Sequence, residues 1–143
     1  MNRYRALTIA FLIIIGNVII DHFFAPVGLF LSPIVTIIAV IIISLNKDKF
    51  DITFQSVLMF ALVALNDIGI KLYGGGIHDS EGQGLVNLFL LICLAPCFII
   101  LSISVIKNKS TVAKKIISVL SFLMLVTLHL YFFSLLGMQQ FYI

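Results

Sequence analysis

The chain has 143 residues, of which 62% are hydrophobic and only 10% are charged. A water-soluble domain is usually about 45–50% apolar and about 25% charged, so these values exclude a soluble globular protein and indicate a protein of the lipid bilayer. The net charge of +3 does not indicate a nucleic-acid partner, because the basic residues lie in short clusters at the ends of apolar runs, which is typical of membrane topology signals.

Apolar runs alternate with short polar breaks along the whole chain, and a helical span needs about 20 mostly apolar residues. Pro26 and Gly28 supply turn chemistry at the first break, and Asp51 is a candidate N-cap after the second. The predicted spans lie at about 6–25, 27–45, 52–72, 85–106 and 112–136. The sequence therefore predicts an all-α integral membrane protein, in which residues 1–143 form a single membrane domain built as a bundle of five transmembrane helices.

The basic residues predict the orientation of this bundle. With five spans, eight of the nine Lys and Arg residues fall on one side of the membrane: Arg3, Arg5, Lys47, Lys49, Lys107, Lys109, Lys114 and Lys115. Under the positive-inside rule this side is cytoplasmic, so the N-terminus is cytoplasmic and the C-terminus is extracytoplasmic. We expect a multi-pass protein of the cell membrane, in particular of a bacterial cytoplasmic membrane, with the glycine-rich loop 73–84 on its outer side.

Ionisable side chains inside the predicted spans gather in the outer half of the bilayer. At a rise of about 1.5 Å per residue, Asp21, Asp67 and His129 all lie about 20–22 Å from the inner ends of their spans. A charged side chain in hydrocarbon costs at least about 2.5–3.5 kcal/mol and often marks function. Asp67 and Asp21 are therefore the candidate catalytic residues, because a buried carboxyl group suits general acid–base chemistry.

Other polar side chains near this level are candidates for binding a substrate or a partner. They are Lys71, Asn66, Asn17, Asn87 and His129. A purely structural interpretation exists for most of them. Lys71 follows Asp67 by four residues, so the two charges can neutralise each other on one helix face. Asn17, Asn66 and His129 can equally hold neighbouring helices together through hydrogen bonds.

The outer loop 73–84 reads YGGGIHDSEGQG and carries candidate ligands for a divalent metal ion, since imidazole and carboxylate groups suit zinc and other first-row metals. The candidate metal ligands are His78, Asp79, Glu81 and, across the bundle, His22. A second interpretation takes Ser80 and Gln83 as a capping box that starts the fourth span. The loop would then be a capped turn.

Two cysteines, Cys93 and Cys97, lie one helical turn apart in the fourth span. Thiolates there could carry a soft metal ion. A buried cysteine more often behaves as a small hydrophobic residue, and we favour that interpretation.

Three classes of function remain open. The first is a non-enzymatic membrane component, such as an accessory, assembly, immunity-type or transport-system subunit, which binds another membrane protein or a second copy of itself. The second is a membrane-embedded enzyme acting on a lipid, a lipid-linked molecule or a peptide, in which Lys71 binds an anionic head group. The third is a small transporter or ion pathway, which is disfavoured because the inner half offers Thr, Ser and Gln55 but no ionisable relay. We favour the first, because the spans use nearly the whole chain.

Overall fold

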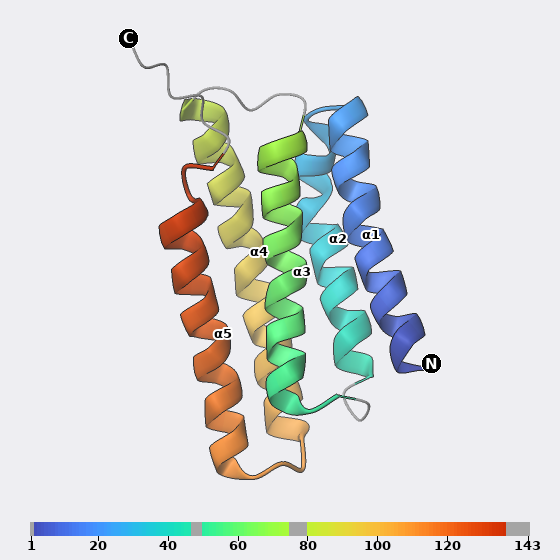
Figure 1. Ribbon diagram of the computed structural model, residues 1–143, viewed down its shortest axis with the longest axis vertical. Helices are drawn as coiled ribbons and strands as arrows, with labels where there is room; N and C mark the ends of the chain where they lie inside the picture. Colours follow the sequence, from blue (N-terminus) through green and yellow to red (C-terminus); the bar gives the residue numbers. More distant parts are fainter. Residues whose placement is uncertain (1, 47–49, 75–79, 137–143) are drawn as a thin grey trace.

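The computed structural model describes residues 2–46, 50–74 and 80–136, and in these residues every regular element is a helix (Figure 1). The helices are α1 (Arg3–Phe23), α2 (Val27–Leu45), α3 (Ile52–Tyr73), α4 (Ser80–Lys107) and α5 (Val112–Phe133). All five are long and apolar enough to cross a membrane. The expected all-α, five-span architecture is confirmed at this level. The largest difference from the predicted boundaries is at α4, which begins five residues before the predicted start at 85, because the helix extends beyond its apolar run.

The helices that begin at the lower end of Figure 1 start at side-chain caps. Asn2 Oδ1 accepts a hydrogen bond from Tyr4 N at 3.4 Å in front of α1, and Asp51 Oδ1 accepts from Thr53 N at 3.0 Å in front of α3. Thr111 caps α5 through its hydroxyl oxygen. Such caps satisfy backbone N–H groups that have no partner inside the helix. The predicted role of Asp51 is confirmed.

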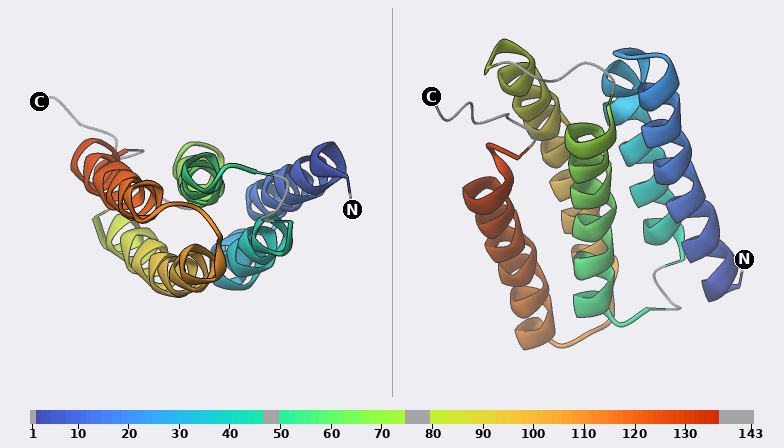
Figure 2. Two further views of the ribbon diagram at one scale, coloured as in Figure 1. Left: turned by 90° about the horizontal axis from the view of Figure 1, so that it is seen from below. Right: turned by 45° about the horizontal axis from the view of Figure 1, so that its top comes forward.

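The bundle has two layers, with α1, α3 and α5 in front and α2 and α4 behind them (Figures 1 and 2). Helix α3 contacts all four other helices and is the most deeply buried, whereas α5 is the least buried. The end-on view in Figure 2 shows α3 between α1 and α5, which lie at opposite edges of the molecule. Groups that must be kept from lipid are therefore best placed on α3.

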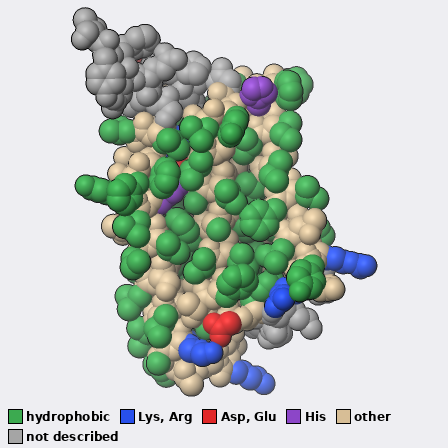
Figure 3. Space-filling model, viewed as in Figure 1, with side chains coloured by type: hydrophobic (Ala, Val, Ile, Leu, Met, Phe, Trp, Pro, Cys, Tyr) green, Lys and Arg blue, Asp and Glu red, His purple; other side chains and the backbone are tan. Residues whose placement is uncertain are grey.

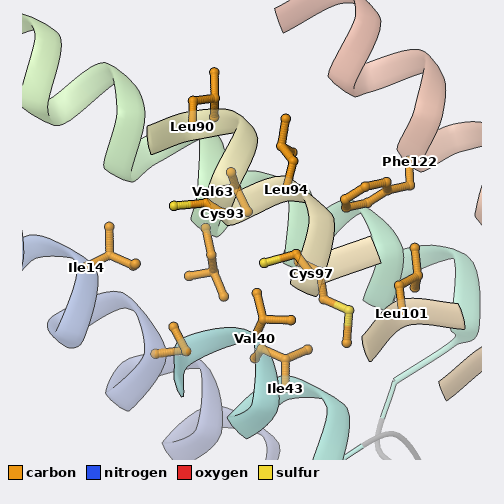
Figure 4. Close-up of a cluster of buried hydrophobic side chains, with 14 of the residues drawn as sticks. Ile14, Val40, Ile43, Val63, Leu90, Cys93, Leu94, Cys97, Leu101 and Phe122 are labelled. Carbon is orange, nitrogen blue, oxygen red and sulfur yellow. The ribbon is translucent and has the colours of Figure 1, made fainter. Parts of the chain in front are cut away.

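The apolar core fills the space between α3, α2 and α4, with further contributions from α1 and α5 (Figure 4). Cys93 and Cys97 are free and buried within it, so both behave there as small hydrophobic side chains. The outer surface is also apolar, and the front face is covered with hydrophobic side chains (Figure 3). Apolar residues both inside and outside are what a helix bundle dissolved in lipid requires.

Helices α1 and α2 lie in close contact at Gly28. A Cβ atom placed on this residue would lie 2.4 Å from Asp21 Cβ and 2.6 Å from Asn17 O. Both distances are far shorter than van der Waals contact, so only glycine fits here. By contrast, a Cβ atom on Gly16 would meet nothing within 4 Å.

The two glycines give a matched pair of variants. Gly28→Ala should lower the free energy of unfolding by about 1–3 kcal/mol, because the added methyl group forces α1 and α2 apart. Gly16→Ala should leave it unchanged or raise it by up to about 1 kcal/mol through better helix propensity. Thermal unfolding of the detergent-purified proteins measures both effects, and equal stability of the two variants would contradict the close contact at Gly28.

Candidate functional site

A buried network of charged side chains joins α3 to α5. Asp67 Oδ2 accepts a hydrogen bond from Lys71 Nζ at 2.8 Å, and it lies 2.8 Å from Nε2 of His129 on α5. The side chains of the three residues are between 0% and 4% exposed. Their meeting on one carboxylate oxygen brings together three of the residues singled out from the sequence.

Lys71 also binds the end of α5. Its ammonium donates a hydrogen bond to the carbonyl oxygen of Phe133 at 2.9 Å. The last carbonyl groups of a helix have no partner inside it and carry partial negative charge. Lys71 thus neutralises Asp67 and the C-terminal end of α5 with a single positive charge.

The ring of His129 is fixed by aromatic neighbours as well as by Asp67. It stacks on the Phe133 ring at a centroid distance of 5.1 Å, and it meets the Phe60 ring edge-on at 5.8 Å. An ionised carboxylate can only accept hydrogen bonds, so the contact with Asp67 requires a proton on Nε2 of His129. The imidazole is therefore held in one orientation, with Nε2 directed at α3.

A second buried cluster joins α1, α2 and α3 through amide and hydroxyl groups. Asn17 Nδ2 lies 2.8 Å from Asn66 Oδ1, 3.0 Å from Gly28 O and 3.2 Å from Ser32 Oγ. Asn66 Nδ2 in turn donates to Ser32 Oγ at 2.8 Å. The two asparagines named from the sequence therefore contact each other directly, and both also bind Ser32, which sequence reasoning did not select.

Asp21 belongs to neither cluster, although the sequence places it at the depth of Asp67. Its Oδ1 atom accepts a hydrogen bond from Leu29 N at 2.9 Å, in the first turn of α2. The N-cap residue of α2, Pro26, makes no side-chain cap, and the positive end of a helix favours a carboxylate. Asp21 thus caps α2 from the neighbouring helix.

Two amide side chains of α4 bind the C-terminal end of α5 beside Lys71. Asn87 Nδ2 donates to Ser134 O at 2.9 Å, and Gln83 Nε2 donates to the same carbonyl. Gln83 is buried and was expected only as part of a capping box. The signal that could have identified its role is its spacing from Asn87, because residues four apart on a helix share a face.

The candidate metal ligands are only partly placed. His22 is exposed, and its Nδ1 atom lies 2.8 Å from the carbonyl oxygen of Tyr73. Glu81 is also exposed, whereas His78 and Asp79 lie outside the described residues. Among the residues that the structure describes, no three His, Cys, Asp or Glu side chains are grouped closely enough to hold a metal ion. The metal site therefore remains a prediction.

A small pocket of about 10 Å³ lies beside the charged network, lined by Asp67, Asn66 and Ser32 among apolar neighbours. This volume corresponds to about one water molecule, so it has no room for an organic substrate. Asp67 Oδ1 and Asn17 Oδ1 are buried without a hydrogen-bond partner in the described part of the chain. One water molecule in the cavity would be in contact with the Asp67 side chain.

The lower half of the bundle in Figure 1 contains buried polar residues that carry no charge. Ser104 Oγ donates to Gln55 Oε1 at 3.2 Å, linking α4 to α3. Ser118 Oγ donates to the carbonyl oxygen of Ile52 at 3.1 Å, linking α5 to α3. Central helix α3 is therefore tied to its neighbours by polar contacts at both ends, and among the described residues the buried charged side chains of these contacts lie at the upper end.

Comparison of the chain with protein-family models, with curated proteins and with solved structures finds no match. The geometry of the site favours interhelical attachment, because the charged groups buried in the described helices are bound to one another or to helix ends.

The Asp67–Lys71 pair gives a direct test of this arrangement. Asp67→Asn or Lys71→Met alone should lower the free energy of unfolding by about 3 kcal/mol or more, because each leaves an uncompensated buried charge. The double variant Asp67→Asn/Lys71→Met should lose less than either single variant. A double-mutant cycle from unfolding in mixed micelles measures the coupling, and additive losses would show that the two charges do not depend on each other.

Proposed function

We propose that this protein is a small non-enzymatic component of the cell membrane that works by binding a partner within the bilayer or at its outer rim. An accessory, assembly, immunity-type or transport-system subunit fits this description. The observation that carries the proposal is that the charged side chains of the outer polar network bind groups within the protein itself. Its charged groups hold helix ends, and the cavity that Asp67 lines is the size of one water molecule.

The short connections between the helices support the same proposal. The described helices run from Arg3 to Phe133 with connections of only a few residues between them. The described part of the chain therefore offers the outward-facing sides of the helices and two short rims for recognition. Large apolar side chains are exposed on every helix, so each helix offers a surface to a second membrane protein or a second copy of this chain.

Site-specific photo-crosslinking in native membranes tests this proposal. One exposed apolar position on each helix takes the photoreactive residue: Leu12, Ile34, Leu65, Leu88 and Leu120. Leu62, which is 1% exposed on α3, is the buried control. A dedicated partner should give protein adducts from one or two helices only, because a docked helix covers a limited face. A second copy of the chain would give an adduct of twice the monomer mass.

Two results would contradict the proposal. Adducts equally weak at all five exposed positions would mean that every face meets only lipid. Conversion of a lipid-linked or peptide substrate by the purified protein, abolished in Asp67→Asn while the fold is retained, would favour the membrane-embedded enzyme instead.

We further propose that the N-terminus is cytoplasmic and the C-terminus extracytoplasmic in a bacterial cytoplasmic membrane. Support comes from the described basic residues that gather at the lower end of the bundle (Figure 3), since loops rich in Lys and Arg stay on the cytoplasmic side. In a variant of the protein from which Cys93 and Cys97 have been removed, a single cysteine introduced at Glu81 should react with a membrane-impermeant maleimide in intact cells. A single cysteine at Ser110 should react only after permeabilisation, and the opposite pattern would reverse the orientation.

A further inference from the structure

A groove opens at the lower end of the bundle, between the start of α3 and the connection from α4 to α5. Phe50, Asp51 and Ile52 line one side, and residues 107–110 line the other. Its volume is about 670 Å³, within the range of about 300–1,000 Å³ that small-ligand sites usually have. It lies at the end of the molecule where Lys and Arg gather (Figure 3), outside the polar network described above.

The groove carries an excess of positive charge. Among the described residues that line it, the one carboxylate is that of Asp51, which is paired with Lys114 at 2.8 Å. The hydrogen bonds from Lys114 and from Thr53 N hold the pKa of the Asp51 carboxyl below its usual value, so it stays ionised and paired at neutral pH. Lys107 and Lys109 are exposed, and within the described part of the chain neither has a hydrogen-bond or ion-pair partner. Two ammonium groups at the groove are thus left without an anion.

The turn between α4 and α5 is locally ordered. Asn108 Oδ1 accepts hydrogen bonds from Ser110 N at 2.8 Å and from Ser110 Oγ at 2.6 Å. These bonds fix the backbone on both sides of Lys109. Lys115, by contrast, is already bound to the carbonyl oxygen of Ile106 at 3.1 Å. The side of the groove formed by residues 107–110 therefore combines an ordered backbone with two unpaired positive charges.

From this geometry we propose that the groove binds the phosphate of an anionic phospholipid, with Lys107 and Lys109 as its cationic ligands. The position supports a lipid over other anions. The groove opens at the ends of spanning helices, where phospholipid head groups lie, and basic pockets between such helices suit phosphate head groups. The proposal goes beyond the proposed function and does not depend on it.

Lipid retention by the purified full-length protein tests the proposal. The protein is reconstituted in nanodiscs of phosphatidylcholine with a minor fraction of phosphatidylglycerol, and retained phosphatidylglycerol is counted by native mass spectrometry after release. The parent protein should retain phosphatidylglycerol over phosphatidylcholine. Lys107→Gln/Lys109→Gln should weaken retention about five-fold for each lysine removed, and Lys107→Arg/Lys109→Arg should restore it.

Arg3→Gln/Arg5→Gln is the matched control. It removes the same charge from the start of α1, at the edge of the molecule opposite α5 (Figure 2), and it should leave retention unchanged. Equal loss in both double variants would overturn the groove as the site, and so would equal retention of the two lipids by the parent protein. Displacement of phosphatidylglycerol by millimolar inorganic phosphate would assign the groove to a free anion instead. Thermal unfolding of each variant verifies that the exposed substitutions leave the fold intact.

Discussion

The constraint on which this bundle depends is the cost of placing charge inside a layer of hydrocarbon. One carboxylate oxygen, Asp67 Oδ2, receives both Lys71 and His129, and all three residues lie on helices long and apolar enough to cross a bilayer. A lipid environment offers these groups no water, so each must find its partner inside the protein. The result is that α5, the least buried helix, is attached to central helix α3 by a contact that neither helix can replace with solvent.

The same constraint explains where the other polar side chains point. Helix ends are the remaining places in the bundle where backbone groups lack partners, and their partial charges have a fixed sign. The carboxylate of Asp21 binds the positive N-terminal end of α2, whereas the ammonium of Lys71 binds the negative C-terminal end of α5. Asn87 supplies a neutral donor at the same negative end. Charge sign and helix polarity match at each position, which favours a structural role for the network.

Hydropathy and charge clusters were sufficient to predict the five helices, because the length of a span is set by the thickness of the bilayer. Depth along each helix was also predictable at a fixed rise per residue. The direction in which a side chain points around its helix was not, because these helices are apolar on nearly all sides. Asp21 and Asp67 bind different neighbours, and Ser32 gave no signal before the helix contacts were known. The proline and glycine at the first break indicated a turn, not the close approach of α1 and α2 that Gly28 permits.

The lysine side chains at the two ends of the bundle differ in burial and in pairing. At the upper end Lys71 is buried, and its ammonium donates hydrogen bonds to Asp67 and to the carbonyl oxygen of Phe133. At the lower end Lys107 and Lys109 remain exposed beside a groove, although Asp51 and Lys114 are paired there. A buried cation must be neutralised by the fold, whereas a cation at the membrane surface can be neutralised by something bound from outside. Substitutions of Lys107 and Lys109 therefore change the surface charge without leaving an unpaired charge buried among the helices, whereas substitution of Lys71 or Asp67 does leave one.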